Sequence, residues 1–275
     1  MDYSLYVTLE KSLFVSHIVI KFAMSELVPQ ILRFESLPST NLEAAQRAIE
    51  GAAEGLCVVA TEQTAGRGRL QRQWISPKGA GLYFSVVLRP RIHQSSWPLI
   101  TLAAALAVHD ALLETYSLKT DIKWPNDILS NNRKLCGILA ETVDTTQGRA
   151  LVLGIGINLT SSALPPEVHE IATSVQVETG KVPNLEIILR NVMIALLRRY
   201  EMLQSARGGE EILREWSVRS SYASGKRIRV ANGPEVLEGT TRGLEIDGAL
   251  RVETDEGEIR IVRAGDVTEL RTLVV

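Results

Sequence analysis

The strongest constraint on the fold is a run of three apolar segments between residues 121 and 159, joined by short connections. They read DIKWPNDIL, KLCGILAETV and RALVLGIGINL, and the connection SNNR after the first has hairpin chemistry. Strands on short turns pair antiparallel, because a parallel pair needs a long crossover. The run therefore predicts an α+β fold with a mixed or antiparallel central sheet and flanking helices, rather than a doubly wound parallel sheet.

Strand-like and helix-like segments alternate around this run. Three more strands are expected, at residues 31–36, 56–62 and 81–90. Helices are expected at residues 39–51, 98–116, 184–204 and 208–221. The segment after Pro98 has apolar residues at helical spacing and no helix-breaking residue, so it is expected to be a central helix packed on the sheet.

The pattern changes beyond Gly225 to short strands separated by glycine turns at Asn232-Gly233, Asp247-Gly248 and Glu256-Gly257. About fifty residues of this kind predict a small β-barrel. The expected organisation is an N-terminal extension at residues 1–29, a main domain at 30–223 and a C-terminal β-barrel domain at 224–275.

Charge and composition exclude several classes of protein. With 30 Lys+Arg against 32 Asp+Glu the net charge is −2, which argues against a general nucleic-acid binder. Cys57 and Cys136 lie in apolar runs without metal-ligand spacing, which suits buried thiols in a reducing compartment. The apolar run at residues 12–20 is too short to span a bilayer and lacks the basic start of a signal peptide. A cytoplasmic protein with no membrane association is expected.

The segment TEQTAGRGRLQRQW, residues 61–74, concentrates arginines among glycines in a chain of balanced charge. Gly66 and Gly68 let the backbone approach a ligand closely, and guanidinium groups match carboxylate and phosphate oxygens. The loop is therefore a candidate anion-binding site. A solvated surface loop would have the same composition, and the residues alone leave both interpretations open.

A second candidate is KWPNDIL, at residues 123–129. Pro125 interrupts the strand, so that Asn126 and Asp127 are turned out at its end beside Lys123. Ordinary turn chemistry explains the proline, the amide and the carboxylate, but not the lysine.

A third candidate is a pair of strands that lack side chains at several positions. Gly137 interrupts KLCGILAE after Lys134, and Gly154 and Gly156 interrupt GIGIN in the next strand. Strand glycines often mark the close approach of a ligand, so neighbouring gaps would form a slot. A pair of β-bulges is the alternative.

The motifs STN, EQTAGRGRLQRQW, KWPNDIL, KLCGILAE and GIGINL, in this order and at these separations, resemble those of the biotin protein ligases. The resemblance runs from about residue 31 to 158 and, through the C-terminal barrel, to the end of the chain. It implies a catalytic domain related to lipoate ligases and class II aminoacyl-tRNA synthetases, followed by an SH3-like barrel. It also implies that biotin and ATP, with Mg²⁺, give biotinyl-5′-AMP, and that a lysine of a biotin carboxyl carrier protein then takes the biotinyl group.

The resemblance also implies roles for individual residues. Lys134, between the biotin carboxylate and the α-phosphate, and Arg69 of the loop are the implied catalytic residues. The implied biotin-binding residues are Ser39, Thr40, Asn41, Gln63, Gly66, Arg67, Gly68, Arg69, Lys134, Gly137, Gly154 and Gly156. The implied ATP- and adenylate-binding residues are Arg69, Arg72, Trp74 (on the adenine side), Lys123, Asn126 and Asn158. Asp127 is the implied Mg²⁺ ligand.

Two departures from the family pattern affect these expectations. Gln71 stands where the loop usually has a glycine, and we expect slower closure of the loop rather than loss of activity. Only about thirty residues precede the first strand of the main domain, fewer than an independent DNA-binding domain needs. A ligase without repressor function or DNA binding is therefore expected. A homodimer through the central sheet and a monomer both stay open.

Two rival functions remain at this point. A lipoate or octanoyl ligase or transferase on the same scaffold would also present a slot and a lysine. A non-catalytic module could instead bind a partner through the barrel and RNA through the arginines. The arginine loop and KWPND favour biotin, because these motifs belong to the biotin branch.

Overall fold

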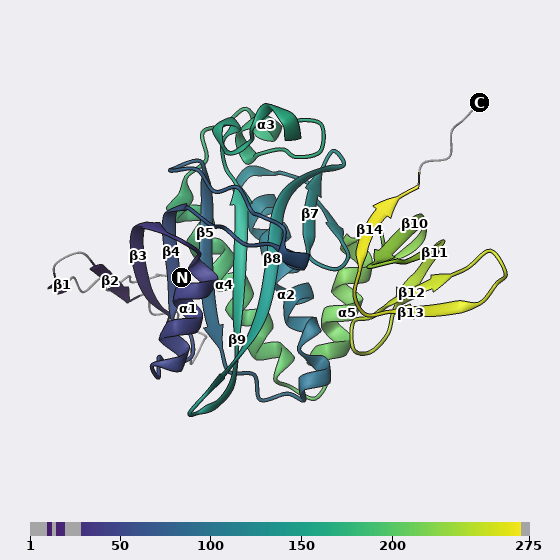
Figure 1. Ribbon diagram of the computed structural model, residues 1–275, viewed down its shortest axis with the longest axis horizontal. Helices are drawn as coiled ribbons and strands as arrows, with labels where there is room; N and C mark the ends of the chain where they lie inside the picture. The colour runs from purple at the N-terminus through teal and green to yellow at the C-terminus, as the bar shows by residue number, and fades with distance from the viewer. Residues whose placement is uncertain (1–9, 13–14, 20–28, 271–275) are drawn as a thin grey trace.

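The computed structural model describes residues 10–12, 15–19 and 29–270 and centres on a nine-stranded sheet (Figure 1). The strand order is β1-β2-β3-β4-β5-β9-β8-β7-β6. Neighbouring strands pair antiparallel throughout, except for the parallel pair β3–β4. The strands are β1 (Glu10–Ser12), β2 (Val15–Val19), β3 (Gln30–Leu37), β4 (Cys57–Gln63), β5 (Gly81–Leu88), β6 (Asp121–Lys123), β7 (Asp127–Ser130), β8 (Arg133–Thr145) and β9 (Gly148–Asn158). The expected mixed α+β sheet is confirmed.

The N-terminal extension expected at residues 1–29 lies largely outside the described residues. Its described parts, β1 and β2, form a hairpin in which β2 pairs with β3. The expected domain boundaries stay predictions.

Helix α1 (Thr40–Ile49) connects β3 to β4 and explains why this pair is parallel. The chain crosses over the sheet between the two strands, and a crossover returns the second strand in the same direction as the first. Ala44 and Ala48 are fully buried, so the helix lies close to Val58 and Val87 of the sheet. This close contact holds the first turn of α1 at the end of β3.

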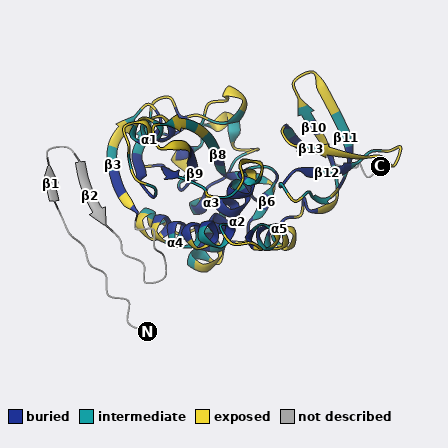
Figure 2. Cartoon of the chain, turned by 90° about the horizontal axis from the view of Figure 1, so that it is seen from below, coloured by how far each residue is buried: buried dark blue, intermediate teal, exposed yellow. Residues whose placement is uncertain are grey.

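The other face of the sheet is covered by α2 (Pro98–Tyr116), α4 (Leu185–Leu203) and α5 (Gly208–Arg219) (Figures 1 and 2). Helix α2 is buried on nearly all sides, which explains its apolar composition. The segment Gln94–Tyr116 is long and apolar enough to cross a membrane, but 72% of its apolar window is buried inside the structure. It is therefore the central core helix that the sequence predicts.

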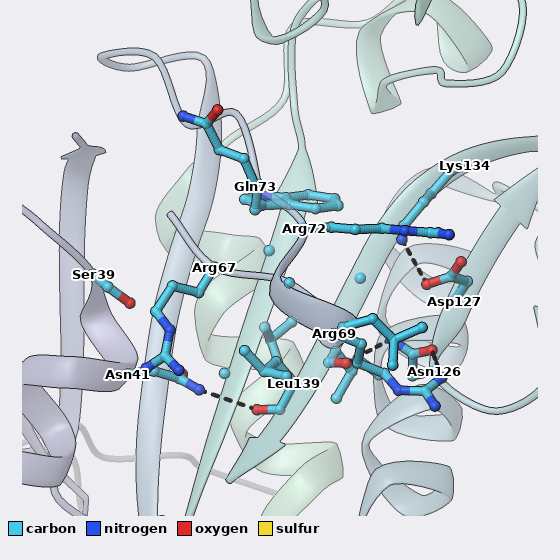
Figure 3. Close-up of a pocket in the computed structure, with 18 of the residues that line it drawn as sticks. Ser39, Asn41, Arg67, Arg69, Arg72, Gln73, Asn126, Asp127, Lys134 and Leu139 are labelled. Atoms are coloured by element: carbon cyan, nitrogen blue, oxygen red, sulfur yellow. Dashed lines mark hydrogen bonds and ion pairs between the residues drawn. The ribbon is translucent and has the colours of Figure 1, made fainter. Parts of the chain in front are cut away.

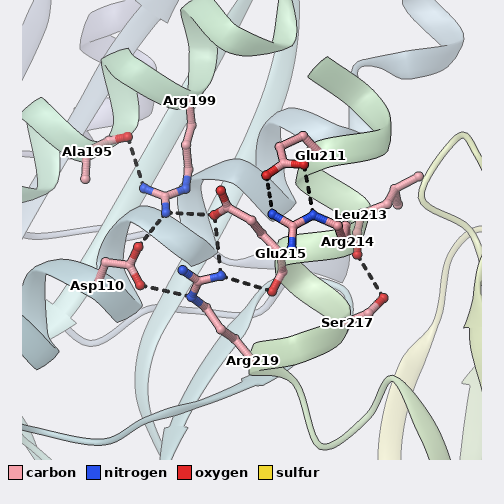
Figure 4. A network of polar contacts seen from close by, with 9 residues as sticks. All are labelled: Asp110, Ala195, Arg199, Glu211, Leu213, Arg214, Glu215, Ser217 and Arg219. Carbon is pink, nitrogen blue, oxygen red and sulfur yellow. Dashed lines mark hydrogen bonds and ion pairs between the residues drawn. The ribbon is translucent and has the colours of Figure 1, made fainter. Parts of the chain in front are cut away.

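An ion-pair cluster joins these three helices (Figure 4). Arg199 of α4 pairs with Asp110 of α2 and with Glu215 of α5, the latter at 2.9 Å. Arg219 of α5 also binds Asp110, with Nε 3.1 Å from Oδ1. The four charges balance within a largely buried site, so the loss of one member leaves an opposite charge incompletely paired.

The expected interruption at Pro125 divides residues 121–129 into two strands, and their pairing as a hairpin was not expected. Pro125 interrupts the ladder, so β6 and β7 form a hairpin around Trp124–Asn126, with a cis peptide bond before the proline. The expected hairpin at SNNR is confirmed, and Asn131 and Asn132 adopt φ of 47° and 61° in it. The short helix α3 (Val175–Thr179) was not predicted, because its five residues contain no repeating helical pattern.

The C-terminal region forms an antiparallel five-stranded sheet of order β13-β12-β11-β10-β14. Its strands are β10 (Ser224–Asn232), β11 (Glu235–Leu244), β12 (Leu250–Glu253), β13 (Ile259–Val262) and β14 (Asp266–Glu269). The expected glycine turns are present, with positive φ at Gly233, Gly248 and Gly257. Trp124 donates a hydrogen bond from Nε1 to the Gly248 carbonyl at 3.0 Å, which fixes this sheet to the main domain.

The ion-pair cluster generates a prediction for stability. Arg199→Met should lower the free energy of unfolding by about 3 kcal/mol, because Asp110 and Glu215 then share only Arg219 in a largely buried site. Arg214→Met on the same helix bundle is the matched control, since Arg214 forms its ion pair with Glu211 at the surface. Its side chain is 65% exposed against 10% for Arg199. Urea unfolding measures both variants, and equal losses would contradict the account.

Candidate functional site

The predicted site residues converge on one cavity over strands β8 and β9 (Figure 3). The start of α1, the arginine loop, the β6–β7 turn and the start of β14 form its walls. The predicted residues that line it are Ser39, Thr40, Asn41, Gln63, Arg67, Gly68, Arg69, Arg72, Trp74, Asn126, Asp127, Lys134, Gly137, Gly154 and Gly156. Segments more than a hundred residues apart in the sequence thus share one site.

Beside α1 the cavity wall is a connected set of polar side chains. The Gln63 Oε1 atom accepts from the Thr40 backbone N–H at 2.8 Å and from the Thr40 hydroxyl at 3.1 Å. The Gln63 amide donates to the Ser76 hydroxyl at 2.8 Å, and the Ser85 hydroxyl lies 2.7 Å from the Thr40 hydroxyl. These bonds fix the direction of each donor and acceptor, which suits recognition of a neutral polar group.

Asn41 continues this set and explains one of the strand glycines. Its Oδ1 atom accepts from Ser85 at 2.6 Å, and its amide donates to Glu141 at 2.8 Å. A Cβ atom at Gly154 would lie 2.1 Å from Asn41 Oδ1. The missing side chain at Gly154 therefore makes room for Asn41.

The other two strand glycines lie beneath Trp74. A Cβ atom would lie 3.0 Å from the Trp74 ring at Gly137 and 2.6 Å from Trp74 Nε1 at Gly156. The two strands pair without a register shift from Cys136↔Ile157 onward, so the bulge alternative is wrong here. The glycines form a flat floor, and the Trp74 ring lies on it. Trp74 Nε1 is buried without a hydrogen-bond partner in the described part of the chain.

The arginine loop folds back on itself over this floor. The Trp74 N–H donates to the Gly66 carbonyl at 2.9 Å, and the Gly68 N–H donates to the Arg72 carbonyl at 2.7 Å. At the tip Leu70 and Gln71 have φ of 53° and 59°, a left-handed conformation that glycine adopts more easily. Gln71 therefore occupies a position whose geometry suits the glycine of the family pattern.

Each arginine of the loop contacts a different part of the structure. Arg67 pairs with Glu141 of β8 at 2.8 Å. Arg69 donates to Asn126 Oδ1 of the β6–β7 turn at 3.0 Å (Figure 3). The third, Arg72, pairs at 2.8 Å with Asp266 of the C-terminal sheet. The loop is thus held at three points by polar contacts.

Positive charge dominates one end of the cavity. Lys134 Nζ lies 2.7 Å from Asp127 Oδ1 and 5.3 Å from the centre of the Trp74 ring. Burial lowers the pKa of the nearby Arg69, although Asp127 and Asp266 oppose this effect. Among the described residues no group of three or more His, Cys, Asp or Glu side chains could hold a metal ion. Mg²⁺ in nucleotide sites is often held by one or two carboxylates together with phosphate oxygens and water. Asp127 can supply one such carboxylate.

Comparisons with known proteins agree with this geometry. Residues 32–158 match the model of the biotin/lipoate A/B protein ligase family, and residues 223–268 match the biotin protein ligase C-terminal domain. A biotin–[acetyl-CoA-carboxylase] ligase of Paracoccus denitrificans is 34% identical over 83% of this chain and 96% of its own length. The chain belongs to the biotin protein ligase family.

Further relatives support this membership. The bifunctional ligase/repressor BirA of Bacillus subtilis is 37% identical over 89% of this chain and 76% of its own length. The structure of the Aquifex aeolicus biotin protein ligase in complex with biotin and ATP superposes with a TM-score of 0.77 at 27% identity. The alignment covers 88% of this chain and 99% of that one.

Three of the residues assigned from the resemblance to biotin protein ligases lie outside the lining of the cavity. At Gly66 a Cβ would lie 2.3 Å from the Trp74 carbonyl oxygen, so this glycine closes the loop. Asn158 is buried, and its amide donates to the Thr173 carbonyl at 3.0 Å. The positive charge of Lys123 helps to lower the pKa of Asp266. Direct ligand binding by these residues stays a prediction.

The sequence does not predict that the C-terminal sheet contributes to the cavity. Gly265 and Asp266 line it beside the arginine loop. The signal in the sequence is the pair Gly265-Asp266 at the start of a short strand. Gly-Asp pairs are also common in ordinary turns, so this pair does not indicate a site. The other lining residues that were missed are Leu70, Gln73, Ile138, Leu139 and Ile155.

The position of Trp74 on the glycine floor generates a test. Gly156→Ala places a methyl group against Trp74 Nε1, so the ring must move, and the free energy of unfolding should fall by about 1–3 kcal/mol. In a Trp74→Ala background the same substitution should cost much less, because the clashing ring is gone. Urea unfolding of the four proteins measures the coupling, and an equal cost in both backgrounds would place Trp74 elsewhere.

Proposed function

We propose that this chain is a biotin–[acetyl-CoA-carboxylase] ligase, which activates biotin with ATP and transfers the biotinyl group to a lysine of a biotin carboxyl carrier protein. The observation that carries the proposal is one cavity in which a fixed polar wall and a strip of strand glycines beneath Trp74 adjoin a group of cations. Family membership over most of the chain supports it.

The first step must overcome repulsion between two anions. A biotin carboxylate oxygen attacks the α-phosphorus of ATP, and the bond to the bridging oxygen breaks as pyrophosphate leaves. Two negative charges about 4 Å apart repel each other by about 4 kcal/mol at the effective dielectric constant of a protein surface. Lys134 and Arg69 are the proposed catalytic residues, because both cations line the cavity and would neutralise the carboxylate and the α-phosphate as they approach each other. Asp127 would hold Mg²⁺, which neutralises phosphate charge when it is bound.

The polar wall beside α1 recognises biotin. Its fixed donors and acceptors pair with the ureido group, which would otherwise lose its hydrogen bonds on leaving water. The proposed biotin-binding residues are Ser39, Thr40, Asn41, Gln63, Gly66, Arg67, Gly68, Arg69, Lys134, Gly137, Gly154 and Gly156. The proposed ATP- and adenylate-binding residues are Arg69, Arg72, Trp74, Lys123, Asn126 and Asn158.

The arginine loop acts as a lid during both steps. A mixed anhydride hydrolyses readily, so a loop that excludes water protects biotinyl-5′-AMP until the acceptor arrives. In the second step the neutral amine of the acceptor lysine attacks the biotinyl carbonyl carbon, the bond to the phosphate oxygen breaks and AMP leaves. The free lysine has a pKa near 10.4, so it loses a proton before attack.

Several finer assignments belong to this proposal. The fold is assigned to the class II aminoacyl-tRNA synthetase-like group and the C-terminal sheet to the SH3-like barrels. A homodimer through the central sheet is supported by β8, whose pairing with β7 ends at Gly137 and leaves residues 139–145 as an edge. Residence in the cytoplasm and absence of DNA binding are also proposed, and the acceptor is a carboxylase subunit.

The function is tested by incubating the protein with labelled ATP, Mg²⁺ and either biotin or lipoate, and by separating the acyl-adenylate. Labelled biotinyl-5′-AMP should form with biotin. A product with lipoate alone would assign the lipoate branch of the family, and no product with either acid would overturn the proposal.

Substitution of Lys134 tests its catalytic role. Lys134→Met should lower the rate constant of biotinyl-5′-AMP formation by about 10²–10³-fold, because a charge aimed at the transition state is removed. Lys78→Met is the control, since Lys78 lies at the surface and forms an ion pair with the exposed Glu35. Single-turnover rates measure the effect. A loss of less than about threefold would remove Lys134 from the catalytic group.

The departure at Gln71 gives a separate expectation. Gln71→Gly should relieve a left-handed strain of about 1 kcal/mol and favour the folded loop, so biotinyl-5′-AMP should dissociate about fivefold more slowly. Gln73→Gly, in the same loop but without a positive φ in the parent, is the matched control and should not slow dissociation. Stopped-flow dissociation rates decide between them, and unchanged rates for Gln71→Gly would rule out a role for the strain.

A further inference from the structure

An ion pair between two residues that line the cavity joins the arginine loop to the C-terminal sheet. Arg72 Nη2 lies 2.8 Å from Asp266 Oδ2, and the two residues are 194 positions apart in the chain. Both side chains line the cavity that holds the proposed catalytic residues. The C-terminal sheet therefore supplies one carboxylate to a site that is otherwise built by the main domain.

The backbone fixes Asp266 in this place. Gly265, directly before it, has φ of 144°, and a Cβ there would lie 2.6 Å from Val230 Cγ1. Asp266 itself pairs with Ala231 at the start of β14, and the next residue, Val267, is buried. A glycine bend followed by an anchored strand thus directs the carboxylate into the cavity.

The C-terminal sheet is in turn fixed to the main domain close to the site. Trp124, at the β6–β7 turn, donates to the Gly248 carbonyl at 3.0 Å. A Cβ at Gly248 would lie 3.1 Å from Leu99 of α2, so the two parts meet closely there. Because this contact is buried, the position of Asp266 relative to the cavity floor is set by packing.

The loop depends on such polar contacts because its tip has little packing. Leu70 is 60% exposed, and the residues around it are joined mainly by bonds within the loop. Arg67 and Arg69 hold the first half of the loop to the main domain. Arg72 holds the second half, and Asp266 is the carboxylate with which it pairs.

The charge of Asp266 is maintained by its surroundings. Burial raises the pKa of this carboxyl, but the hydrogen bond from Arg72 and the positive charges of Arg72, Lys123 and Lys134 together lower it below its usual value. Asp266 is therefore ionised at neutral pH, as the pairing with Arg72 requires.

We propose that Asp266 is a positioning residue that holds Arg72, and with it the arginine loop, closed over the cavity. The C-terminal sheet thereby controls how long biotinyl-5′-AMP is retained. The second half of this inference rests on the proposed function, whereas the contact between Arg72 and Asp266 does not depend on it. The two halves call for separate measurements.

Hydrogen exchange of the ligand-free protein tests the contact. Asp266→Asn keeps the shape of the side chain and removes its charge, so the backbone amides of Gly68, Arg72 and Trp74 should exchange about two- to fivefold faster, as expected for loss of an exposed ion pair. Asp255→Asn, which breaks the surface pair with Arg227 in the same sheet, is the matched control. Unchanged exchange in Asp266→Asn would overturn the proposal.

Release of biotinyl-5′-AMP tests the consequence. Asp266→Asn should speed dissociation of biotinyl-5′-AMP about two- to fivefold, and Asp266→Glu should restore the parent rate. The double variant Arg72→Gln/Asp266→Asn should release biotinyl-5′-AMP no faster than Arg72→Gln alone. The effect of Asp266→Asn on this rate should be smaller at 0.5 M NaCl, because salt screens the ion pair. Additive effects would show that the two residues act separately and would refute the proposal. If Asp266→Asn exchanges faster but the parent protein forms no biotinyl-5′-AMP, the contact is supported and the proposed function is refuted.

Discussion

The strip without side chains at Gly137, Gly154 and Gly156 is the constraint on which the rest of the site depends. At these glycines strands β8 and β9 each have a paired strand on both sides, where branched side chains would pack best. The three glycines instead admit Asn41 from one side and the Trp74 ring from above. The polar wall, the position of the arginine loop and the flat floor all follow from this one gap.

Electrostatics sets the second constraint. A site that brings a carboxylate to a triphosphate needs several cations, and cations that gather in a partly buried cavity repel one another. Asp127 pairs with Lys134, and Asp266 pairs with Arg72. These two carboxylates offset part of the positive charge, and Arg69 leaves an excess that favours an anionic ligand.

The sequence predicts most of the fold because local chemistry is consistent there. Pro98 and the apolar residues after it specify α2, and Asn131-Asn132 specifies the β7–β8 hairpin. The interruption by Pro125 was predicted, but the pairing of the residues on its two sides was not. That pairing depends on the neighbouring strand β8 rather than on local preference.

The site was predicted less completely, for a physical reason. Motifs identify residues whose chemistry is unusual, such as glycines in strands or arginines in a loop. They do not reveal that Gly154 makes room for Asn41, or that Asp266 from a separate sheet reaches Arg72. Such contacts join distant parts of the chain, and only the packing of α1, the loop and the C-terminal sheet brings them together.

The central claim is that one cavity activates biotin with ATP, and exchange of labelled pyrophosphate into ATP tests it most directly. This exchange requires reversible formation of biotinyl-5′-AMP and needs no acceptor protein. The account predicts exchange that depends on both biotin and Mg²⁺ and that lipoate does not support. Exchange that is independent of biotin, or no exchange when biotin and Mg²⁺ are present, would contradict it.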